Sequence, residues 1–139
     1  MKDLSLLQPV LVQAALTFVL LFWMGGARFA ALRAGTVDLG GDGERTKWRG
    51  RAGILSNAFH NQLEMPVLFY AAVAFALLAD AADWEMQVFA WAFVAFRIVH
   101  AAIFTTYNVV MHRAMAYLAS NIALIAMWVN LALTVFLGW

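Results

Sequence analysis

The chain has 139 residues, of which 65% are hydrophobic and only 12% are charged, and its mean hydropathy is +0.78. This number of charged residues is too small to cover the surface of a soluble domain of this length. A water-soluble globular protein is therefore excluded, and an integral membrane protein is predicted. The absence of cysteine excludes disulfides and cysteine nucleophiles, and a net charge of +1 without any aromatic and basic platform gives no sign of nucleic-acid binding.

Apolar runs long enough to cross a membrane begin near the start of the chain. The hydrocarbon core of a bilayer is about 30 Å thick, which takes about 20 residues of helix. The first predicted helix covers residues 7–33, a run too long for the core of a signal peptide. A glycine-rich, charged loop follows at residues 34–54, with the sequence "AGTVDLGGDGERTKWRGRAG" over most of its length.

Three further helices follow in the same way. They are predicted at residues 55–79, 84–110 and 113–138, and the acidic turn "DAAD" separates the first two of them. Alternation with a period of two is absent, which favours helices over barrel strands. The sequence therefore predicts an all-α integral membrane protein, a four-helix bundle forming a single domain over residues 1–139.

The charges of the loops predict an orientation. Basic residues gather at the end of the first helix and in the loop after it, and they are Arg28, Arg33, Arg45, Lys47, Arg49 and Arg51. Arg113 marks the third connection, whereas the second connection carries only acidic residues. Because cytoplasmic loops are enriched in lysine and arginine, both termini are expected on the non-cytoplasmic side, and basic loop residues are expected to contact anionic membrane lipids.

Polar residues inside the predicted spans follow helical spacing. On the second helix, Asn57, His60, Asn61 and Glu64 share one face at i, i+3, i+4 and i+7, just ahead of Pro66. The third helix carries a stripe of Arg97, His100, Phe104, Tyr107 and Asn108, and the fourth carries Arg113, Tyr117, Ser120 and Asn121. Ionisable groups inside a bilayer cost about 2.5–3.5 kcal/mol each, so these stripes should face the bundle interior or a subunit boundary.

Two readings of these polar residues can be weighed from the residues themselves. Glu64 and Arg97 could lie at similar depth, so a structural ion pair that clamps two helices is favoured over a catalytic role for Glu64. A metal site built from His60, Glu64 and His100 is disfavoured, because no two histidines are close in sequence and no second carboxylate faces them.

Two segments together resemble a known family. "RAGILSNAFHNQLEMPVLFY", followed by "FRIVHAAIFTTYNVVMHRAMAYLAS", resembles the MAPEG family, the membrane-associated proteins in eicosanoid and glutathione metabolism. The Asn-x-x-Glu element at Asn61 and Glu64 is the most recognisable signature, and Arg97, Arg113 and Tyr117 match in order and spacing. The resemblance spans nearly the whole chain and looks like that of a divergent, bacterial-type member, which implies a bacterial inner membrane.

The resemblance implies a homotrimer with glutathione sites between subunits. Arg113 would be the catalytic arginine that stabilises the thiolate. The glutathione-binding residues would be Arg28, Asn61, Glu64, Tyr117, His60 and Asn57. No metal is implied, and the second substrate would be a lipophilic small molecule.

The chain also departs from the family pattern. Asn57 and His60 occupy positions where glutathione-using members carry arginine, and a histidine is not a permanent cation. Phe104 stands where active relatives often have a tyrosine, and Tyr107 is one turn away.

Three functions are therefore open from the sequence. The first is a glutathione transferase or peroxidase acting on lipophilic electrophiles or lipid hydroperoxides. The second is a non-catalytic scaffold or accessory subunit of the same fold, alone or in a larger membrane complex. The third is a lipid-binding, quinone-binding or proton-relay component that uses Glu64, His60 and His100.

Overall fold

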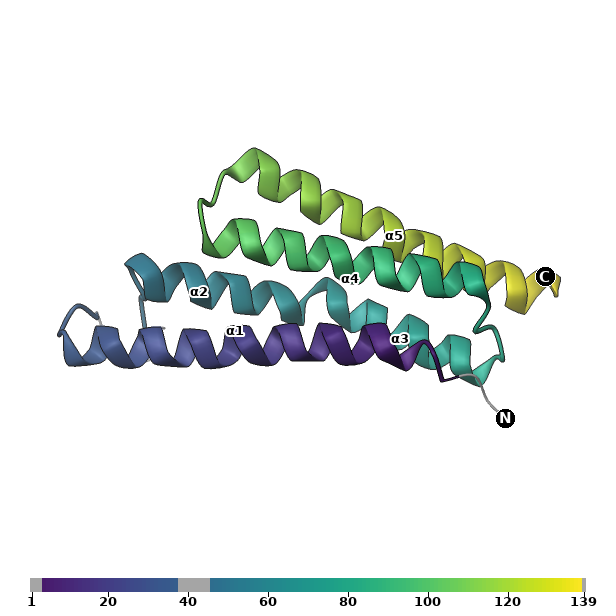
Figure 1. Cartoon of the computed structure of the whole chain (residues 1–139), viewed down its shortest axis with the longest axis horizontal. Coiled ribbons are helices and arrows are strands. Elements are labelled where there is room, and N and C mark those ends of the chain that lie inside the picture. The colour runs from purple at the N-terminus through teal and green to yellow at the C-terminus, as the bar shows by residue number, and fades with distance from the viewer. Residues whose placement is uncertain (1–3, 38–45, 139) are drawn as a thin grey trace.

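The computed structural model describes residues 4–37 and 46–138, and its regular elements there are helices (Figure 1). In chain order they are α1 (Leu7–Arg33), α2 (Gly50–His60), the short 3-10 helix η1 (Asn61–Leu63), α3 (Met65–Leu78), α4 (Trp84–Thr105) and α5 (Val110–Leu137). Because α2, η1 and α3 together form one span, the described residues contain four segments long and apolar enough to cross a membrane. The predicted four-helix membrane fold is confirmed.

Several helix ends differ from the predicted ones. The second span begins at Gly50 rather than at 55. In its first turn, Arg51 stacks on the Trp23 ring and donates to the main-chain carbonyl of Thr105. The third helix ends at Thr105 rather than at 110, because the backbone leaves the helical conformation at Thr106, with φ and ψ angles of −107° and −98°. Asn108 then takes a left-handed backbone with a φ of 48°. The fourth helix begins at Val110 rather than at 113. Within the predicted loop, residues 38–45, and with them Arg45, lie outside the described residues.

The second span is broken where the sequence places Pro66. Proline has no N–H to donate, so it is tolerated in the first turn of a helix but not inside one. The break is the 3-10 turn η1, after which Glu64 has φ and ψ angles of −95° and −100°. Side-chain amides bond to main-chain carbonyls just before it: Asn61 Nδ2 donates to the carbonyl of Asn57 at 2.9 Å, and Gln62 Nε2 to that of Ala58 at 3.4 Å.

The helices form two packed pairs. α1 runs beside α2, η1 and α3, and α4 packs along α5 (Figure 1). One core cluster joins α3, α4 and α5, where the rings of Phe69 and Phe93 stack with centroids 4.7 Å apart. A smaller cluster of Leu20, Ala58, Ala101 and Phe104 joins α1, α2 and α4. This smaller cluster lies next to the polar residues described below.

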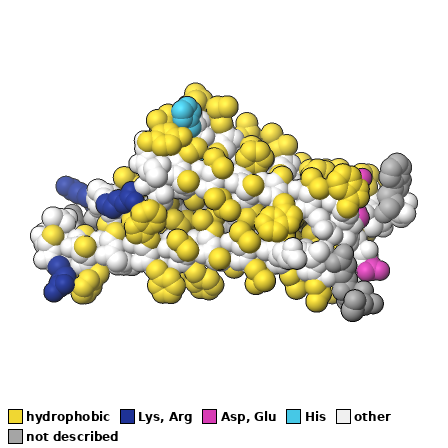
Figure 2. Space-filling view, viewed as in Figure 1, with side chains coloured by type: hydrophobic (Ala, Val, Ile, Leu, Met, Phe, Trp, Pro, Cys, Tyr) yellow, Lys and Arg dark blue, Asp and Glu magenta, His cyan; other side chains and the backbone are white. Residues whose placement is uncertain are grey.

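The outer surface is apolar, and the charges lie at its two ends. Large hydrophobic side chains such as Phe22, Leu78 and Phe136 are more than three-quarters exposed, as suits contact with lipid or with another membrane subunit. Figure 2 shows arginine and lysine at one end of the visible face and acidic side chains at the other. This separation matches the loop charges of the sequence, and which end faces the cytoplasm stays a prediction.

Candidate functional site

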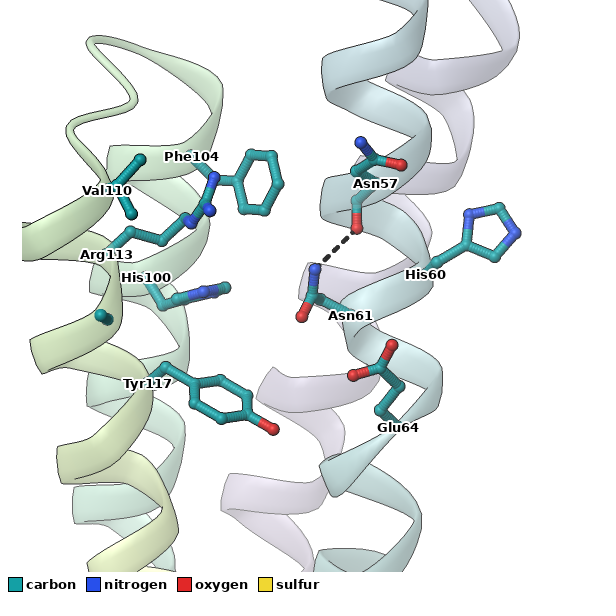
Figure 3. A pocket seen from close by; sticks show the side chains of 10 residues that line it. Asn57, His60, Asn61, Glu64, His100, Phe104, Val110, Arg113 and Tyr117 are labelled. Atoms are coloured by element: carbon teal, nitrogen blue, oxygen red, sulfur yellow. Dashed lines mark hydrogen bonds between the residues drawn. The ribbon is translucent and has the colours of Figure 1, made fainter. Parts of the chain in front are cut away.

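A cavity of about 420 Å³, here called the groove, lies between α2 and η1 on one side and α4 and α5 on the other (Figure 3). Its lining residues are Asn57, His60, Asn61, Glu64, His100, Phe104, Val110, Arg113, Ala114 and Tyr117. Six of the seven residues that the resemblance assigned to the glutathione site are therefore brought together, and Arg28 is the exception. Helical spacing predicted which residues of each helix share a face, because residues at i, i+3, i+4 and i+7 do so.

The α2 side of the groove presents polar groups at the helix break. The side chain of Asn61 turns back to the carbonyl of Asn57, and Glu64 is exposed at the end of η1. In Figure 3 the ring of His60 points away from Arg113, whereas the carboxylate of Glu64 rises beside the opening. This wall therefore carries one carboxylate, amides and an imidazole, but no arginine.

Arg113 supplies the positive charge of the groove from the first turn of α5. Its Nη1 donates to Asn108 Oδ1 at 2.8 Å, and its guanidinium carbon lies 4.3 Å from the centroid of the Phe104 ring. Asn108, in the connection between α4 and α5, holds the guanidinium through the hydrogen bond, and Phe104 of α4 holds it through the ring contact. A cation held in this way faces the groove with donors to spare, because one guanidinium has five N–H groups.

His100 also lines the groove. The sequence placed it on the polar stripe, in a disfavoured metal site and in a possible relay, but not among the glutathione ligands. Its side chain is 3% exposed, and its Nδ1 has no hydrogen-bond partner among the described residues. The ring lies between aromatic neighbours, with centroids 5.8 Å from Phe104 and 5.7 Å from Tyr117. A buried imidazole nitrogen without a partner is unusual in a folded protein.

Arg97 lies behind the groove rather than in it. The side chain is fully buried, its Nη2 donates to the main-chain carbonyl of Asn61, and its guanidinium carbon lies 5.8 Å from the Tyr117 ring centroid. Within the described residues no direct ion pair joins Arg97 to Glu64, although the sequence predicted one. The helix break accounts for the difference, because it exposes the Asn61 carbonyl to Arg97 and leaves Glu64 at the open side of the groove.

The profile of the MAPEG family matches residues 6–133, nearly the whole chain. The chain belongs to the MAPEG family. No curated protein and no solved structure matches the chain. The resemblance found in the sequence is therefore confirmed at the level of the family, whereas an activity does not follow from the match alone.

In this MAPEG protein, Arg28 lies in a second cavity, of about 530 Å³, on the other side of α2. Its Nε donates to the hydroxyl of Ser56 at 3.0 Å, and its guanidinium carbon lies 4.8 Å from the centroid of the Trp48 ring. Asn57 and His60 line both this cavity and the groove, so the two cavities meet there. We call the second one the Arg28 cavity.

Tyr107 does not lie in the groove of this MAPEG protein, which corrects the stripe drawn from the sequence. It lines a separate, mainly apolar cavity of about 370 Å³, where its ring centroid lies 5.8 Å from that of His112. The reason is the early end of α4 at Thr105, after which the chain no longer follows the helical spacing. Tyr107 therefore cannot supply the hydroxyl that Phe104 lacks.

Proposed function

We propose that this MAPEG protein binds glutathione in the groove and activates its thiol for reaction with a lipophilic substrate. The observation that carries the proposal is Arg113, which Asn108 and Phe104 hold as a cation at the groove. A thiol with a pKa of about 8.5 is mostly protonated at neutral pH, and only its thiolate is a good nucleophile. A guanidinium beside the sulfur favours the thiolate over the thiol.

The other groups of the groove suit a peptide ligand. A volume of about 420 Å³ lies in the range of about 300–1,000 Å³ that small-molecule sites have. Glu64 can accept hydrogen bonds from an ammonium group, and Asn61 and Tyr117 can bond to amides. The residues present therefore fit glutathione, with fewer cations than its carboxylates would favour.

Two reactions are compatible with an activated thiol. In a conjugation, the thiolate forms a C–S bond to an electrophilic carbon such as the β-carbon of an unsaturated carbonyl, whose π electrons move to the oxygen. The proton released from the thiol then returns at the α-carbon. In a peroxidase reaction, two glutathione thiols are oxidised to the disulfide while a lipid hydroperoxide is reduced to the alcohol and water. The exposed apolar side chains around the bundle suit a substrate that arrives from the bilayer.

A homotrimer belongs to the same proposal. Glutathione has two carboxylates, but among the described residues only one arginine lines the groove, and Arg28 of the same chain lies on the other side of α2. A neighbouring subunit could bring its own Arg28 to the groove and would also cover part of the exposed apolar surface. The groove would then be completed by two chains.

A non-catalytic role of the same fold is the alternative. Phe104 lines the groove without a hydroxyl, and Asn57 and His60 stand where arginines would hold the carboxylates. In that case the groove would bind a ligand, or nothing, without thiolate chemistry.

Replacing Arg113 by alanine tests the proposed activity. In lipid vesicles with glutathione and the electrophile 1-chloro-2,4-dinitrobenzene, we expect the conjugation rate to fall about 100-fold, the usual effect of removing one group that stabilises a developing anion. Arg113→Lys should keep part of the rate, because a cation remains. Arg33→Ala is the matched control, since Arg33 is exposed at the end of α1 against Phe29 and should leave the rate unchanged. Equal rates for the Arg113→Ala variant and the unmodified protein would contradict the proposal.

A further inference from the structure

A third cavity, of about 450 Å³, lies where the end of α1 meets the start of α2 (Figure 1). Small side chains from both helices form its floor, and they are Ala27, Ala30, Ala31, Ala34 and Ala52. Arg49 and Arg51 line the same cavity, and none of its described lining residues is acidic. We call this cavity the alanine pocket. It combines a mainly apolar floor with two positive charges, and it shares no lining residue with the groove or the Arg28 cavity.

The two arginines of the alanine pocket are held differently. The guanidinium carbon of Arg51 lies 4.7 Å from the centroid of the Trp23 ring, and its Nη1 donates to the main-chain carbonyl of Thr105. Arg49 is exposed, and its side chain makes no hydrogen bond, ion pair or ring contact with the described residues. Because a guanidinium has five N–H donors, both arginines have donors left for an anion. Phosphate is an anion whose geometry the planar guanidinium matches.

The alanine pocket lies at the depth of the membrane surface. The helix α1 begins at Leu7, and about 20 residues of helix cross the hydrocarbon core, so the core ends near Ala27. Trp23 lies one turn before this point, and tryptophan is enriched at the boundary between lipid and water. The last two turns of α1, which line the pocket, therefore enter the layer of the lipid headgroups.

The face of α1 that lines the alanine pocket continues into the bilayer. Val19, Trp23, Ala27, Ala30 and Ala34 follow one another in steps of three or four residues, so they share one side of the helix. Val19 and Trp23 are 59% and 45% exposed. A molecule with an anionic head in the pocket would therefore find apolar side chains for its tail directly below. An anion without a tail, such as free phosphate, would leave these side chains uncovered.

We propose that the alanine pocket binds an anionic phospholipid. The guanidinium groups of Arg49 and Arg51 bind its phosphate, the glycerol lies on the alanine floor, and the acyl chains run along Trp23 and Val19. The methyl side chains of the floor leave the space that larger residues would fill. The sequence predicted only that basic loop residues contact anionic lipids, whereas the pocket assigns a defined site to one lipid molecule. The proposal does not depend on the reaction proposed above, because the groove is a different cavity.

Native mass spectrometry of the full-length protein in detergent tests the proposal. The probes are dioleoylphosphatidylglycerol, which is anionic, and dioleoylphosphatidylcholine, which has the same chains but no net charge. Each basic residue near an anionic lipid strengthens binding about fivefold, so two arginines should favour the anionic lipid about 25-fold. Glycerol 3-phosphate, which carries the phosphate without chains, should bind much more weakly than the anionic lipid.

Two variants change the alanine pocket without disturbing the packing of the helices. Arg49→Gln should weaken binding of the anionic lipid about fivefold and leave the zwitterionic lipid unaffected. Arg49 is chosen because Arg51 also holds Thr105, so that a change of Arg51 could affect folding. Ala30→Leu fills the pocket while both arginines remain, and it should weaken binding at least as much as Arg49→Gln does, since Ala30 is exposed on its floor.

Matched controls change charge and size outside the alanine pocket. Arg33→Gln removes an exposed arginine that contacts Phe29 near the end of α1, and Ala74→Leu enlarges an exposed alanine of α3. Both controls should bind the anionic lipid as the unmodified protein does.

Four results would overturn the proposal. Equal affinity for the two lipids would show that the site does not select an anion, and equal affinity for glycerol 3-phosphate would make it a site for free phosphate. If Arg49→Gln and Ala30→Leu bind the anionic lipid as well as the controls do, the lipid lies elsewhere. If these two variants instead lower the number of chains in the complex without changing lipid binding, a second copy of the chain covers the pocket.

Discussion

At the scale of single residues, the guanidinium of Arg113 is positioned by contacts with its neighbours. Asn108 accepts from its Nη1, and the left-handed backbone of Asn108, with a φ of 48°, places that side chain at the start of α5. Asparagine tolerates this conformation better than most residues do. The direction of the Arg113 side chain is therefore determined by Asn108, a residue of the turn between α4 and α5.

Gly53 is a second residue whose identity matters, because a Cβ there would lie 2.6 Å from the main-chain oxygen of Trp48. The backbone would have to shift, at a cost of about 1–3 kcal/mol. We therefore expect Gly53→Ala to lower the thermal stability of the protein in detergent, followed by circular dichroism, and to disturb the stacking of Arg28 on Trp48.

Gly26→Ala provides the control for that substitution. A Cβ at Gly26 meets nothing within 4 Å, and alanine is the better helix former, so its stability should be unchanged or higher. Equal melting temperatures for the two variants would contradict the close approach of Trp48 to α2.

The residues of the groove could be predicted from the sequence because polar side chains recur there at helical spacing in an apolar background. The contacts of Arg97 could not be predicted in the same way. Spacing shows which residues share a helix face. It does not show that the main-chain carbonyl of Asn61, freed by the break, would accept the hydrogen bond from Arg97 in place of Glu64. His100 carried a signal as the buried histidine of its stripe, although no partner could be assigned to it.

At the scale of elements, the break between α2 and α3 positions one wall of the groove. Gln13 of α1 donates from Nε2 to Gln62 Oε1 at 3.0 Å, and both side chains are buried. Arg97 approaches the same turn from α4 through the carbonyl of Asn61. Polar contacts from two neighbouring helices thus hold η1, the segment that carries Asn61 and precedes Glu64.

Replacing Gln13 by leucine should destabilise the protein by about 1–3 kcal/mol, because Gln62 Oε1 would be buried without a donor. The double variant Gln13→Leu, Gln62→Leu should recover part of this loss, since two apolar groups leave no unpaired acceptor. Gln8→Leu is the control, as Gln8 is exposed on the same helix. Thermal unfolding in detergent measures all of them, and a double variant less stable than the sum of the single changes would contradict the bridge.

The sequence predicted an unbroken second helix over residues 55–79, which the turn η1 corrects, and it gave no direct sign of the Gln13 contact. Glutamine in a spanning helix can face a neighbouring helix, a groove or the lipid headgroups. Which of these applies depends on the relative rotation of α1 and η1, and that is decided by packing rather than by local spacing.

At the scale of the whole molecule, the outer face in Figure 2 has its charged side chains at two ends and apolar side chains between them. The four spans were predictable because the thickness of the bilayer sets how many consecutive apolar residues a spanning helix needs. The relative placement of the two helix pairs, and with it the groove, was not predictable, because hydropathy does not specify which faces meet.

The orientation can be tested with single cysteines, because the chain has none of its own. Ala34 and Ala79 are exposed at opposite ends of the bundle, after α1 and after α3. If basic loops face the cytoplasm, a membrane-impermeant maleimide should label Ala79→Cys in intact spheroplasts and should label Ala34→Cys only after lysis. The reverse pattern would contradict the predicted orientation.

The central claim is that the groove beside Arg113 holds the thiol of glutathione, and an experimental density map of the assembled protein with glutathione tests it most directly. The account predicts three chains, with tripeptide density in each groove, its sulfur next to the Arg113 guanidinium and a neighbouring chain's Arg28 near a carboxylate. A map collected in excess glutathione that shows an empty groove, or a lipid in place of the tripeptide, would contradict it.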